Sequence, residues 1–394
     1  MKHRILVLGA GYAGAITAGA LAHRLRPEDF EITLVNAAPV FVQRLRLHQV
    51  ATGQDVEAPA LSDIFAGTGV RVRLAKVTAV DPASNTVAVT GENGDEEIPY
   101  DTLCYTLGSA AADHGVPGVA EHSFDSTGHS GALRLRDRLG GLGKGGKVMV
   151  VGEGLTGIET VTEIAESRPD LSVSLVARGE PGAWFSPAAR RHLDETFDRL
   201  GVTVHDHTSI ERVEQTQVVS TDGTAYGSDA TVWAAGFSIS PIAAAGGLEV
   251  VDDGRMAVDR TMRSLSHPNV YAAGDTVFAA DNHGRPLPMS CASAGYTALQ
   301  AAGSIAGRLT GQKIGMTKLT YFGNHISLGR KDGLIQLVDG RSHSLSRPVR
   351  GRKAARVKEG ILRMTLWTVR HPTFGMPKRK HRLAAGRPGE KVSA

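Results

Sequence analysis

RILVLGAGYAGAITAGALA, residues 4–22, is the stretch that decides the fold of this chain, and KVMVVGEGLTGIETVTEIA, residues 147–165, repeats it. Each stretch joins a short apolar run to a G-x-G-x-x-G turn and then to a helical segment rich in small residues. The first glycine permits a tight turn, the second lets the backbone approach a pyrophosphate, and the third lets the helix pack on the strand. The helix N-terminus then offers N–H groups to the phosphates. Two such turns in matching contexts predict two bound dinucleotides.

The repeat continues beyond the glycine turns. In each half, alternating apolar residues punctuated by Asn, Asp and Gly follow the turn, which predicts antiparallel strands. Each half then ends in an apolar strand that closes on a glycine, Gly108 in the first and Gly236 in the second. A further apolar strand delivers Gly274 and Asp275 at its carboxyl end, where ligands of an open α/β sheet bind.

These landmarks predict an α/β fold of two Rossmann-like, three-layer ββα dinucleotide-binding domains. Antiparallel strands are inserted in each domain, and a C-terminal segment follows. We expect the first part of one domain at residues 1–115 and the second domain at 116–245. The second part of the first domain is expected at 246–312, and the C-terminal segment with its basic tail at 313–394.

The motifs together resemble those of the FAD/NAD(P)-linked pyridine nucleotide oxidoreductases. Within that family the chain is most similar to the type II NADH dehydrogenase branch, especially to its shorter actinobacterial members. The resemblance covers residues 4 to about 335 and is carried by VLGAGYAG, FVQRLRLHQVATGQ, YDTLCYTLGS, VVGEGLTGIE, VWAAGF, NVYAAGD and ISLGRKDG.

The resemblance implies two sets of cofactor contacts. In the first, glycines bind the FAD pyrophosphate, the backbone of Val77 approaches the adenine, Asp275 contacts the ribityl or pyrophosphate region, and two arginines pass close to the flavin. In the second, Glu159 lies near the nicotinamide ring and Gly236 beneath it. The FAD set comprises Gly9, Gly11, Gly14, Asn36, Arg44, Arg46, Val77, Gly108, Gly274, Asp275 and Ala294. The nicotinamide set comprises Gly152, Gly154, Gly157, Glu159, Arg178 and Gly236.

Both halves lack the acidic residue that usually accepts the ribose hydroxyls about 20 positions after the turn. The first half has Asn36 there, and an amide can still accept and donate. The second half has Ala177 followed by Arg178. Loss of the carboxylate removes repulsion of a 2′-phosphate, which a guanidinium can bind, so we favour NADPH over NADH. Two alternatives remain: Arg178 is a solvated loop charge, or Glu180 restores a preference for NADH.

The remaining chemistry gives weaker signals. The two cysteines, Cys104 and Cys291, are far apart in sequence and lack dithiol spacing; we expect Cys104 to be a buried structural thiol. Quinone-reducing members of the family carry a glutamine in an A-Q pattern, whereas this chain has SAGY at 293–296. His325 is the best candidate for a proton donor, although a structural histidine is an alternative. No Cys/His cluster has the spacing of a metal site.

The predicted activity is transfer of a hydride from NAD(P)H to FAD and onward to a quinone-like small molecule. One alternative is a flavoenzyme of specialised metabolism that oxidises or reduces a natural-product scaffold with little use of the nicotinamide site. Another is a flavin-bearing partner protein that docks through its basic tail.

Charge is concentrated at the C-terminus. Residues 341–394 contain fifteen Lys and Arg but only Glu359 and Glu390, a net charge of +13, which leaves −9 for residues 1–340. In this tail Ala354, Val357, Ile361, Leu362 and Val369 are expected on one helix face, and Arg356, Arg363 and Arg370 on the other.

Such a helix could lie on an anionic membrane or dock on the body of the protein or on a twin subunit. We expect a cytoplasmic protein, and two further alternatives stay open: peripheral attachment at the inner face of the membrane, and a homodimer. Nucleic-acid binding is not expected because no reading motif accompanies the charge.

Overall fold

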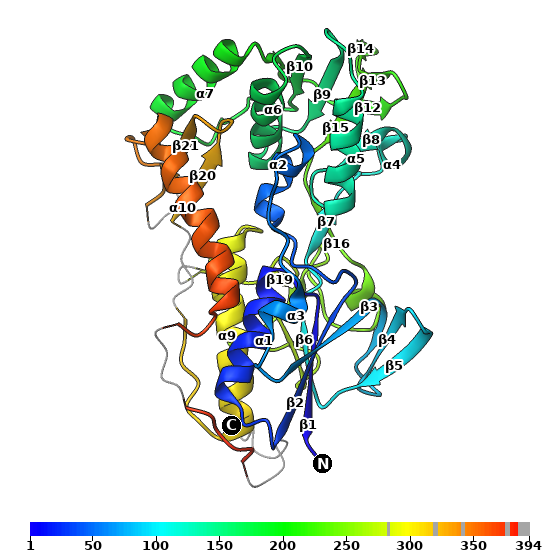
Figure 1. The fold of residues 1–394 in the computed structure, drawn as a ribbon, viewed down its shortest axis with the longest axis vertical. Helices are drawn as coiled ribbons and strands as arrows, with labels where there is room; N and C mark the ends of the chain where they lie inside the picture. The colour runs from blue at the N-terminus through cyan, green and yellow to red at the C-terminus, as the bar shows by residue number, and fades with distance from the viewer. Residues whose placement is uncertain (282–283, 318–321, 340–342, 375–378, 385–394) are drawn as a thin grey trace.

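The computed structural model describes residues 1–281, 284–317, 322–339, 343–374 and 379–384 (Figure 1). It has two lobes, each built around a parallel sheet, with the N-terminus at the outer end of the lower lobe in this view. The predicted α/β fold of two Rossmann-like domains with antiparallel insertions is confirmed. Within the described residues, no helix is both long enough and apolar enough to cross a membrane.

The lower lobe contains a seven-stranded sheet in the order β18-β6-β1-β2-β3-β4-β5. The first five strands are parallel, and β4 and β5 add the predicted antiparallel insertion. Helices α1 (Tyr12–Arg24) and α9 (Cys291–Thr310) pack on each other beside it, because their many Ala and Gly residues permit a close approach. The strands are β1 (His3–Leu8), β2 (Phe30–Asn36), β3 (Val70–Asp81), β4 (Thr86–Gly91), β5 (Gly94–Pro99), β6 (Thr102–Tyr105) and β18 (Val270–Ala272).

The upper lobe contains a five-stranded parallel sheet in the order β11-β10-β9-β15-β8 and a three-stranded antiparallel sheet, β12-β13-β14. Its helices are α5 (His129–Gly140), α6 (Leu155–Ser167) and α7 (Pro187–Leu200). The strands are β8 (Ser123–Phe124), β9 (Lys147–Val151), β10 (Ser172–Val176), β11 (Thr203–His205), β12 (Ile210–Val213), β13 (Gln217–Ser220), β14 (Ala225–Gly227) and β15 (Ala230–Trp233).

Two connections between the lobes lie within residues 1–245. Strands β7 (Ser109–Ala111) and β16 (Phe237–Ile239) form an antiparallel ribbon where the chain passes between the lobes. Helix α2 (Leu47–Ala51) belongs to the first half in sequence but packs on α5 and α6 of the upper lobe. Short elements complete the fold: η1 (Arg44–Arg46), α3 (Leu61–Ile64), α4 (Val119–His122), α8 (Ile242–Ala245), β17 (Met256–Ala257) and β19 (Val277–Phe278).

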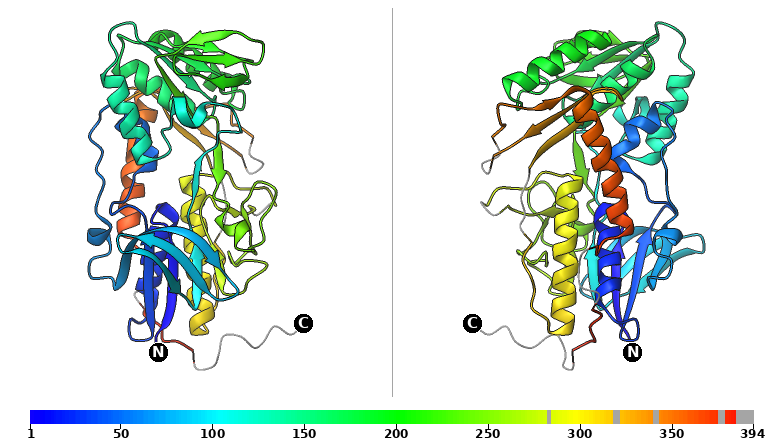
Figure 2. Two further views of the ribbon diagram at one scale, coloured as in Figure 1. Left: turned by 90° about the vertical axis from the view of Figure 1, so that its right-hand side faces the viewer. Right: turned by 60° about the vertical axis from the view of Figure 1, so that its left-hand side comes forward.

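The C-terminal segment forms a small antiparallel sheet and one long helix. The sheet contains β20 (Gly323–Ser327), β21 (Gly333–Leu337) and β22 (Val349–Arg350). Helix α10 (Gly351–Arg370) starts against this sheet and runs down to α1, so it spans both lobes (Figure 2). The helix is therefore docked on the body of the protein, which is one of the two predicted alternatives.

The prediction for the inner face of α10 was partly wrong. Ala354, Leu362 and Val369 are buried as expected, but Val357 is 48% exposed and Lys358 is buried in its place. Position 358 lies four residues from both Ala354 and Leu362, so it shares their face of the helix. The expected arginines Arg356, Arg363 and Arg370 are exposed. Part of the basic tail, including Lys378, Arg387 and Lys391, lies outside the described residues.

Candidate functional site

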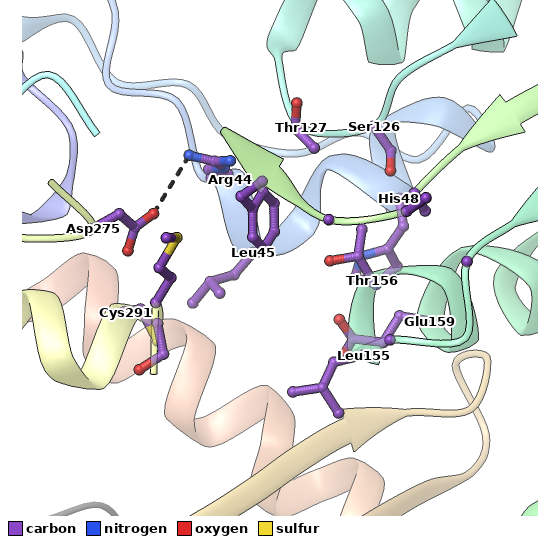
Figure 3. A pocket seen from close by; sticks show the side chains of 18 of the residues that line it. Arg44, Leu45, His48, Ser126, Thr127, Leu155, Thr156, Glu159, Asp275 and Cys291 are labelled. Carbon is purple, nitrogen blue, oxygen red and sulfur yellow. Dashed lines mark ion pairs between the residues drawn. The ribbon is translucent and has the colours of Figure 1, made fainter. Parts of the chain in front are cut away.

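A cavity of 1010 Å³ lies between the lobes, at the carboxyl ends of both parallel sheets. Figure 3 shows its walls: the segment around Arg44 and His48 on one side, the start of α6 with Glu159 on another, and Asp275 and Cys291 opposite. The cavity brings together most of the predicted site residues. Those that line it are Gly11, Arg44, Gly108, Gly152, Gly154, Glu159, Arg178, Gly236, Gly274, Asp275, Ala294 and His325.

The third glycine of each turn is required by packing. A Cβ at Gly14 would lie 1.8 Å from the carbonyl oxygen of Gly9, and a Cβ at Gly157 would lie 1.8 Å from that of Gly152. The first glycines have φ of +90° and +123°, which side chains rarely adopt. The two turns therefore have the same geometry, as the sequence predicts.

The second glycine of each turn faces open space. Apart from the glycine itself and its two chain neighbours, no heavy atom of the described residues lies within 4 Å of a Cβ built at Gly11 or at Gly154. Both positions line the cavity and both cap a 13-residue helix. This is the space that a pyrophosphate needs to approach the backbone at a helix N-terminus, so the residues present fit two dinucleotides.

Six predicted residues do not line the cavity: Gly9, Gly14, Asn36, Arg46, Val77 and Gly157. The side chain of Asn36 is engaged by the glycine turn itself, since its Oδ1 accepts from Ala10 N (2.9 Å) and its Nδ2 donates to Ala38 O (2.7 Å). Arg46 forms a two-pronged ion pair with Glu359 of α10, at 2.8 and 3.0 Å. Val77 is buried in β3 opposite Val89. Contacts of these residues with a cofactor stay predictions.

Arg44 is held at the junction of the lobes. Its Nη1 donates to Ser109 O (2.8 Å) and lies 3.8 Å from Asp275 Oδ2, and its guanidinium lies over the ring of Phe237. Burial lowers its pKa. Its Nη2 is buried with no hydrogen-bond partner in the described part of the chain. An unsatisfied buried donor is costly, so this atom suits an acceptor atom of a bound molecule.

Glu159 forms an ion pair with a residue that sequence analysis did not single out, and the two side chains are only 12% and 9% exposed. Its Oε1 lies 2.9 Å from Lys358 Nζ and accepts from Ser327 N (2.9 Å). Lys358 also donates to the carbonyl oxygen of His325 (2.6 Å). Burial alone would raise the pKa of Glu159. The charge of Lys358, the ring of His48 and the hydrogen bond from the Ser327 N–H lower it by more than burial raises it. The pKa therefore lies below its usual value, and the carboxylate is charged at neutral pH. The signal available in the sequence was the position of Lys358, four residues from both Ala354 and Leu362, which were expected on one face of the helix.

His48 also escaped sequence analysis. It lines the cavity, is 5% exposed, and has no hydrogen-bond partner for Nε2 among the described residues, although Glu163 Oε2 lies 3.9 Å away. Burial lowers its pKa to about 4, so the ring is neutral. Burial likewise lowers the pKa of His325, and the charge of Lys358 adds to this effect. A neutral imidazole can still donate one hydrogen bond.

Near the end of β10, Arg178 lines the cavity while its backbone N–H donates to Glu153 Oε2 (3.2 Å). Within the described residues no carboxylate is within ion-pairing distance of its guanidinium. Glu180, the residue that could have restored a preference for NADH, pairs instead with Arg190 at 2.6 Å.

The two cysteines are free. Cys104 is fully buried in β6, and burial raises its pKa to about 12, which fits the expected structural thiol. Cys291 is the first residue of α9 and lines the cavity, and burial raises its pKa as well. Of the SAGY stretch that replaces the family's glutamine pattern, Ala294 lines the cavity.

Comparison with known proteins agrees with this geometry. Residues 3–300 match the pyridine nucleotide-disulphide oxidoreductase family. An NADH dehydrogenase-like protein of Mycobacterium tuberculosis is 30% identical over 318 residues, covering 73% of this chain and 76% of that protein. A type II NADH:quinone oxidoreductase of Staphylococcus aureus is 26% identical over 391 residues, covering 91% and 94%.

Among solved structures, the NDH2 of Plasmodium falciparum in complex with NADH has the same fold. It superimposes with a TM-score of 0.78 at 15% identity and covers 96% of this chain and 100% of that one. The predicted resemblance is confirmed by these matches. The chain belongs to the pyridine nucleotide-disulphide oxidoreductase family, in its type II NADH dehydrogenase-like branch, and is an oxidoreductase.

Proposed function

We propose that the chain binds FAD through its first glycine turn and NADPH, in preference to NADH, through its second, and passes electrons to a quinone-like small molecule. The observation that carries this proposal is the pair of open glycine positions, Gly11 and Gly154, which face one cavity from two lobes. The relative in Staphylococcus aureus, a type II NADH:quinone oxidoreductase, supports the class of acceptor.

When bound, a flavin would supply the two-electron redox chemistry. The chain provides binding, position and charge. The helix N-termini after Gly11 and Gly154 would hold the pyrophosphates, and Arg44 Nη2, which has no partner in the described part of the chain, would donate to an acceptor atom of the bound molecule. Asp275 binds the ribityl region.

The protein's own groups also control protons. Lys358 Nζ holds a proton beside Glu159, where it can stabilise negative charge that develops in the cavity. The neutral ring of His325 can donate a hydrogen bond to an oxygen of the acceptor. We therefore assign His325 the role of a hydrogen-bond donor to the acceptor, because a neutral ring with a lowered pKa keeps its N–H proton at neutral pH.

Preference for NADPH rests on Ala177 and Arg178. A 2′-phosphate would meet a guanidinium with no competing ion pair in the described structure, and Glu180 is held by Arg190. The decisive experiment is anaerobic titration of the purified, yellow protein with NADPH and then with NADH, followed by flavin absorbance. We expect NADPH to reduce the flavin faster. An Arg178→Glu variant is expected to raise the KM for NADPH about tenfold or more, since it exchanges a charge-assisted contact for repulsion.

Arg191→Glu is the matched control, because it makes the same change of charge on the exposed side of α7. It is expected to leave the preference unchanged. Faster reduction of the wild-type protein by NADH would refute the role of Arg178, and a colourless protein that takes up no flavin would refute the whole proposal.

The acceptor can be tested separately. Steady oxidation of NADPH with menadione supports the quinone-like acceptor. A bound flavin that neither NADPH nor NADH reduces would instead favour the alternative of a specialised-metabolism flavoenzyme, for which the missing glutamine of the A-Q pattern is the motivating observation.

The outer face of α10 supports peripheral attachment to an anionic membrane. Val357 (48% exposed), Met364 (60%) and Trp367 (37%) stand among exposed arginines, and Phe374 follows at 76%. Basic faces with large apolar side chains bind the interface of anionic bilayers. A Met364→Ser/Trp367→Ser variant is expected to lose pelleting with anionic vesicles and keep its activity, whereas unchanged pelleting would contradict the attachment. Deleting α10 would be a poor test, because it would also remove Lys358.

A further inference from the structure

The loop between β10 and α7 carries an aromatic side chain in an unusual position. Trp184 lines the cavity and is 42% exposed, although tryptophan is a residue type that proteins bury to a large extent on average. It lies six residues after Arg178 in the same loop. Two small polar residues, Thr208 and Ser209, line the cavity as well, from the loop after β11.

The backbone that carries this indole is fixed from two sides. Ser344 Oγ donates to the carbonyl oxygen of Trp184 (2.8 Å). Two residues further on, the N–H and the hydroxyl of Ser186 both donate to Oε1 of Gln336, at 3.1 and 2.8 Å. Gln336 is fully buried in β21, so the C-terminal sheet holds the loop in place.

The ring itself also has a fixed support. Phe185, which is 6% exposed, meets Trp184 with ring centroids 5.1 Å apart in an edge-on arrangement. Its own N–H is bonded to Gly182 O (2.8 Å), which closes the turn before it. The indole is thus held by its neighbours while much of its surface stays uncovered.

The strand order of the upper sheet indicates which end of a dinucleotide would lie near the ring of Trp184. In the upper sheet, β10 lies on the opposite side of β9 from β15. A dinucleotide bound with its pyrophosphate at Gly154 has its nicotinamide end toward Gly236, after β15, and its adenosine end toward the loop after β10. Arg178 and Trp184 are both in that loop.

We propose that Trp184 is the stacking platform for the adenine base of the nicotinamide nucleotide. This deepens the proposed function and rests on it. Arg178 binds the phosphate on the ribose and Trp184 binds the base, so affinity for the adenosine end comes from one loop. Stacking is suited to this position because every base has a π-face and an exposed indole offers a flat apolar surface.

The test uses two donors that differ only in the adenosine end. NADPH has it, whereas reduced nicotinamide mononucleotide has the nicotinamide and lacks the adenine. Trp184→Ala is expected to raise the KM for NADPH about tenfold with kcat unchanged, given the usual contribution of base stacking. The rate constant for flavin reduction by the mononucleotide is expected to stay the same. Trp184→Phe, which keeps an aromatic face, is expected to change the KM for NADPH less than threefold.

A second measurement does not depend on electron transfer. Calorimetric titration of the flavin-loaded protein with 2′,5′-ADP is expected to show about tenfold weaker binding for Trp184→Ala than for the wild type. Trp367→Ala, which removes an exposed tryptophan of α10, is the matched control and is expected to bind like the wild type.

The possible outcomes distinguish a failure of the Trp184 platform from a failure of the proposed redox function. Wild-type protein that binds 2′,5′-ADP in a Trp184-dependent manner but is reduced by no donor keeps the platform and refutes the redox function. Trp184→Ala protein that binds 2′,5′-ADP as the wild type does, or that loses the reaction with the mononucleotide to the same degree as with NADPH, overturns the platform.

Discussion

The two glycine turns are nearly identical in backbone geometry but differ in what surrounds them. In the first half, the position that normally accepts ribose is Asn36, and its side chain is committed to bonds with Ala10 and Ala38. In the second half, the position is Ala177, and a cation follows it. Two residues after the third glycine, the first half has the buried Ile16 and the second has the charged Glu159. The two turns thus offer the same open backbone, and the proposed difference between their ligands rests on the side chains around them.

The largest effect on function is expected from a substitution in each of the two glycine turns. Gly14→Ala and Gly157→Ala place a methyl group against backbone carbonyls, which a core relieves only by moving the helix, at a cost of about 3 kcal/mol or more. If the halves bind different cofactors, Gly14→Ala loses the flavin, whereas Gly157→Ala keeps the flavin and is no longer reduced by NADPH. Absorbance of the purified variants, followed by anaerobic titration, measures both.

Gly140→Ala is the control, since a Cβ there meets nothing within 4 Å among the described residues. It is expected to bind flavin and to be reduced normally. Equal loss of flavin from both turn variants would contradict the separation of the two halves.

The next prediction is a loss of stability at Glu159, the charged residue whose counterpart in the first half is Ile16. Lys358→Met leaves the largely buried carboxylate of Glu159 without its cation, and we expect a loss of about 4 kcal/mol in the free energy of unfolding. Urea denaturation measures this loss. Glu159→Gln/Lys358→Met is expected to recover part of it, because no unpaired charge remains. A single variant as stable as the wild type would show that the pair is solvated rather than buried.

A decrease in the free energy of unfolding at low pH is expected from His48. Its folded pKa of about 4 is below the usual 6.5, so the unfolded chain binds the proton more tightly. This contribution is constant above pH 6.5, and as the pH falls toward 4 it lowers the free energy of unfolding by about 3 kcal/mol. Urea denaturation at pH 7 and pH 4 measures the difference. His48→Gln is expected to show a smaller decline than the wild type, and parallel declines would rule out this residue as the cause.

The smallest effect is expected where α10 meets the first half. The ion pair of Arg46 with Glu359 is partly exposed, with 12% and 32% of the two side chains accessible. A double-mutant cycle of Arg46→Ala and Glu359→Gln is expected to give a coupling of about 1 kcal/mol. A coupling energy as large as the loss of stability expected for Lys358→Met would show that the two ion pairs of α10 do not differ in strength.

The sequence predicted the fold because its signals are local. A glycine turn between an apolar run and a small-residue helix is a complete structural unit, and the chain contains two of them in the same order of elements. Most of the predicted site residues line the cavity because they follow strands of parallel sheets, whose carboxyl ends meet at one edge. The thiol of Cys104 was also predicted to be buried, from its place in an apolar strand.

The errors and omissions all involve segments that are distant in sequence. Lys358 is near Glu159 only because α10 crosses both lobes, and the apolar pattern of the helix favoured Val357 for that face instead. His48 is buried because α2 leaves its own half and packs on α5 and α6. Arg46 is only two residues from Arg44, yet it pairs with a helix more than 300 residues later.

By itself, the sequence determined the two turns, the two sheets and the family, because glycine spacing and apolar alternation act over a few residues. Only the tertiary structure decided which charges are buried and paired. The pairing of Glu159 with Lys358, the neutral state of His48 and the open face of Trp184 depend on the approach of distant elements. Desolvation and ion pairing act through space, and no local pattern in the chain encodes them.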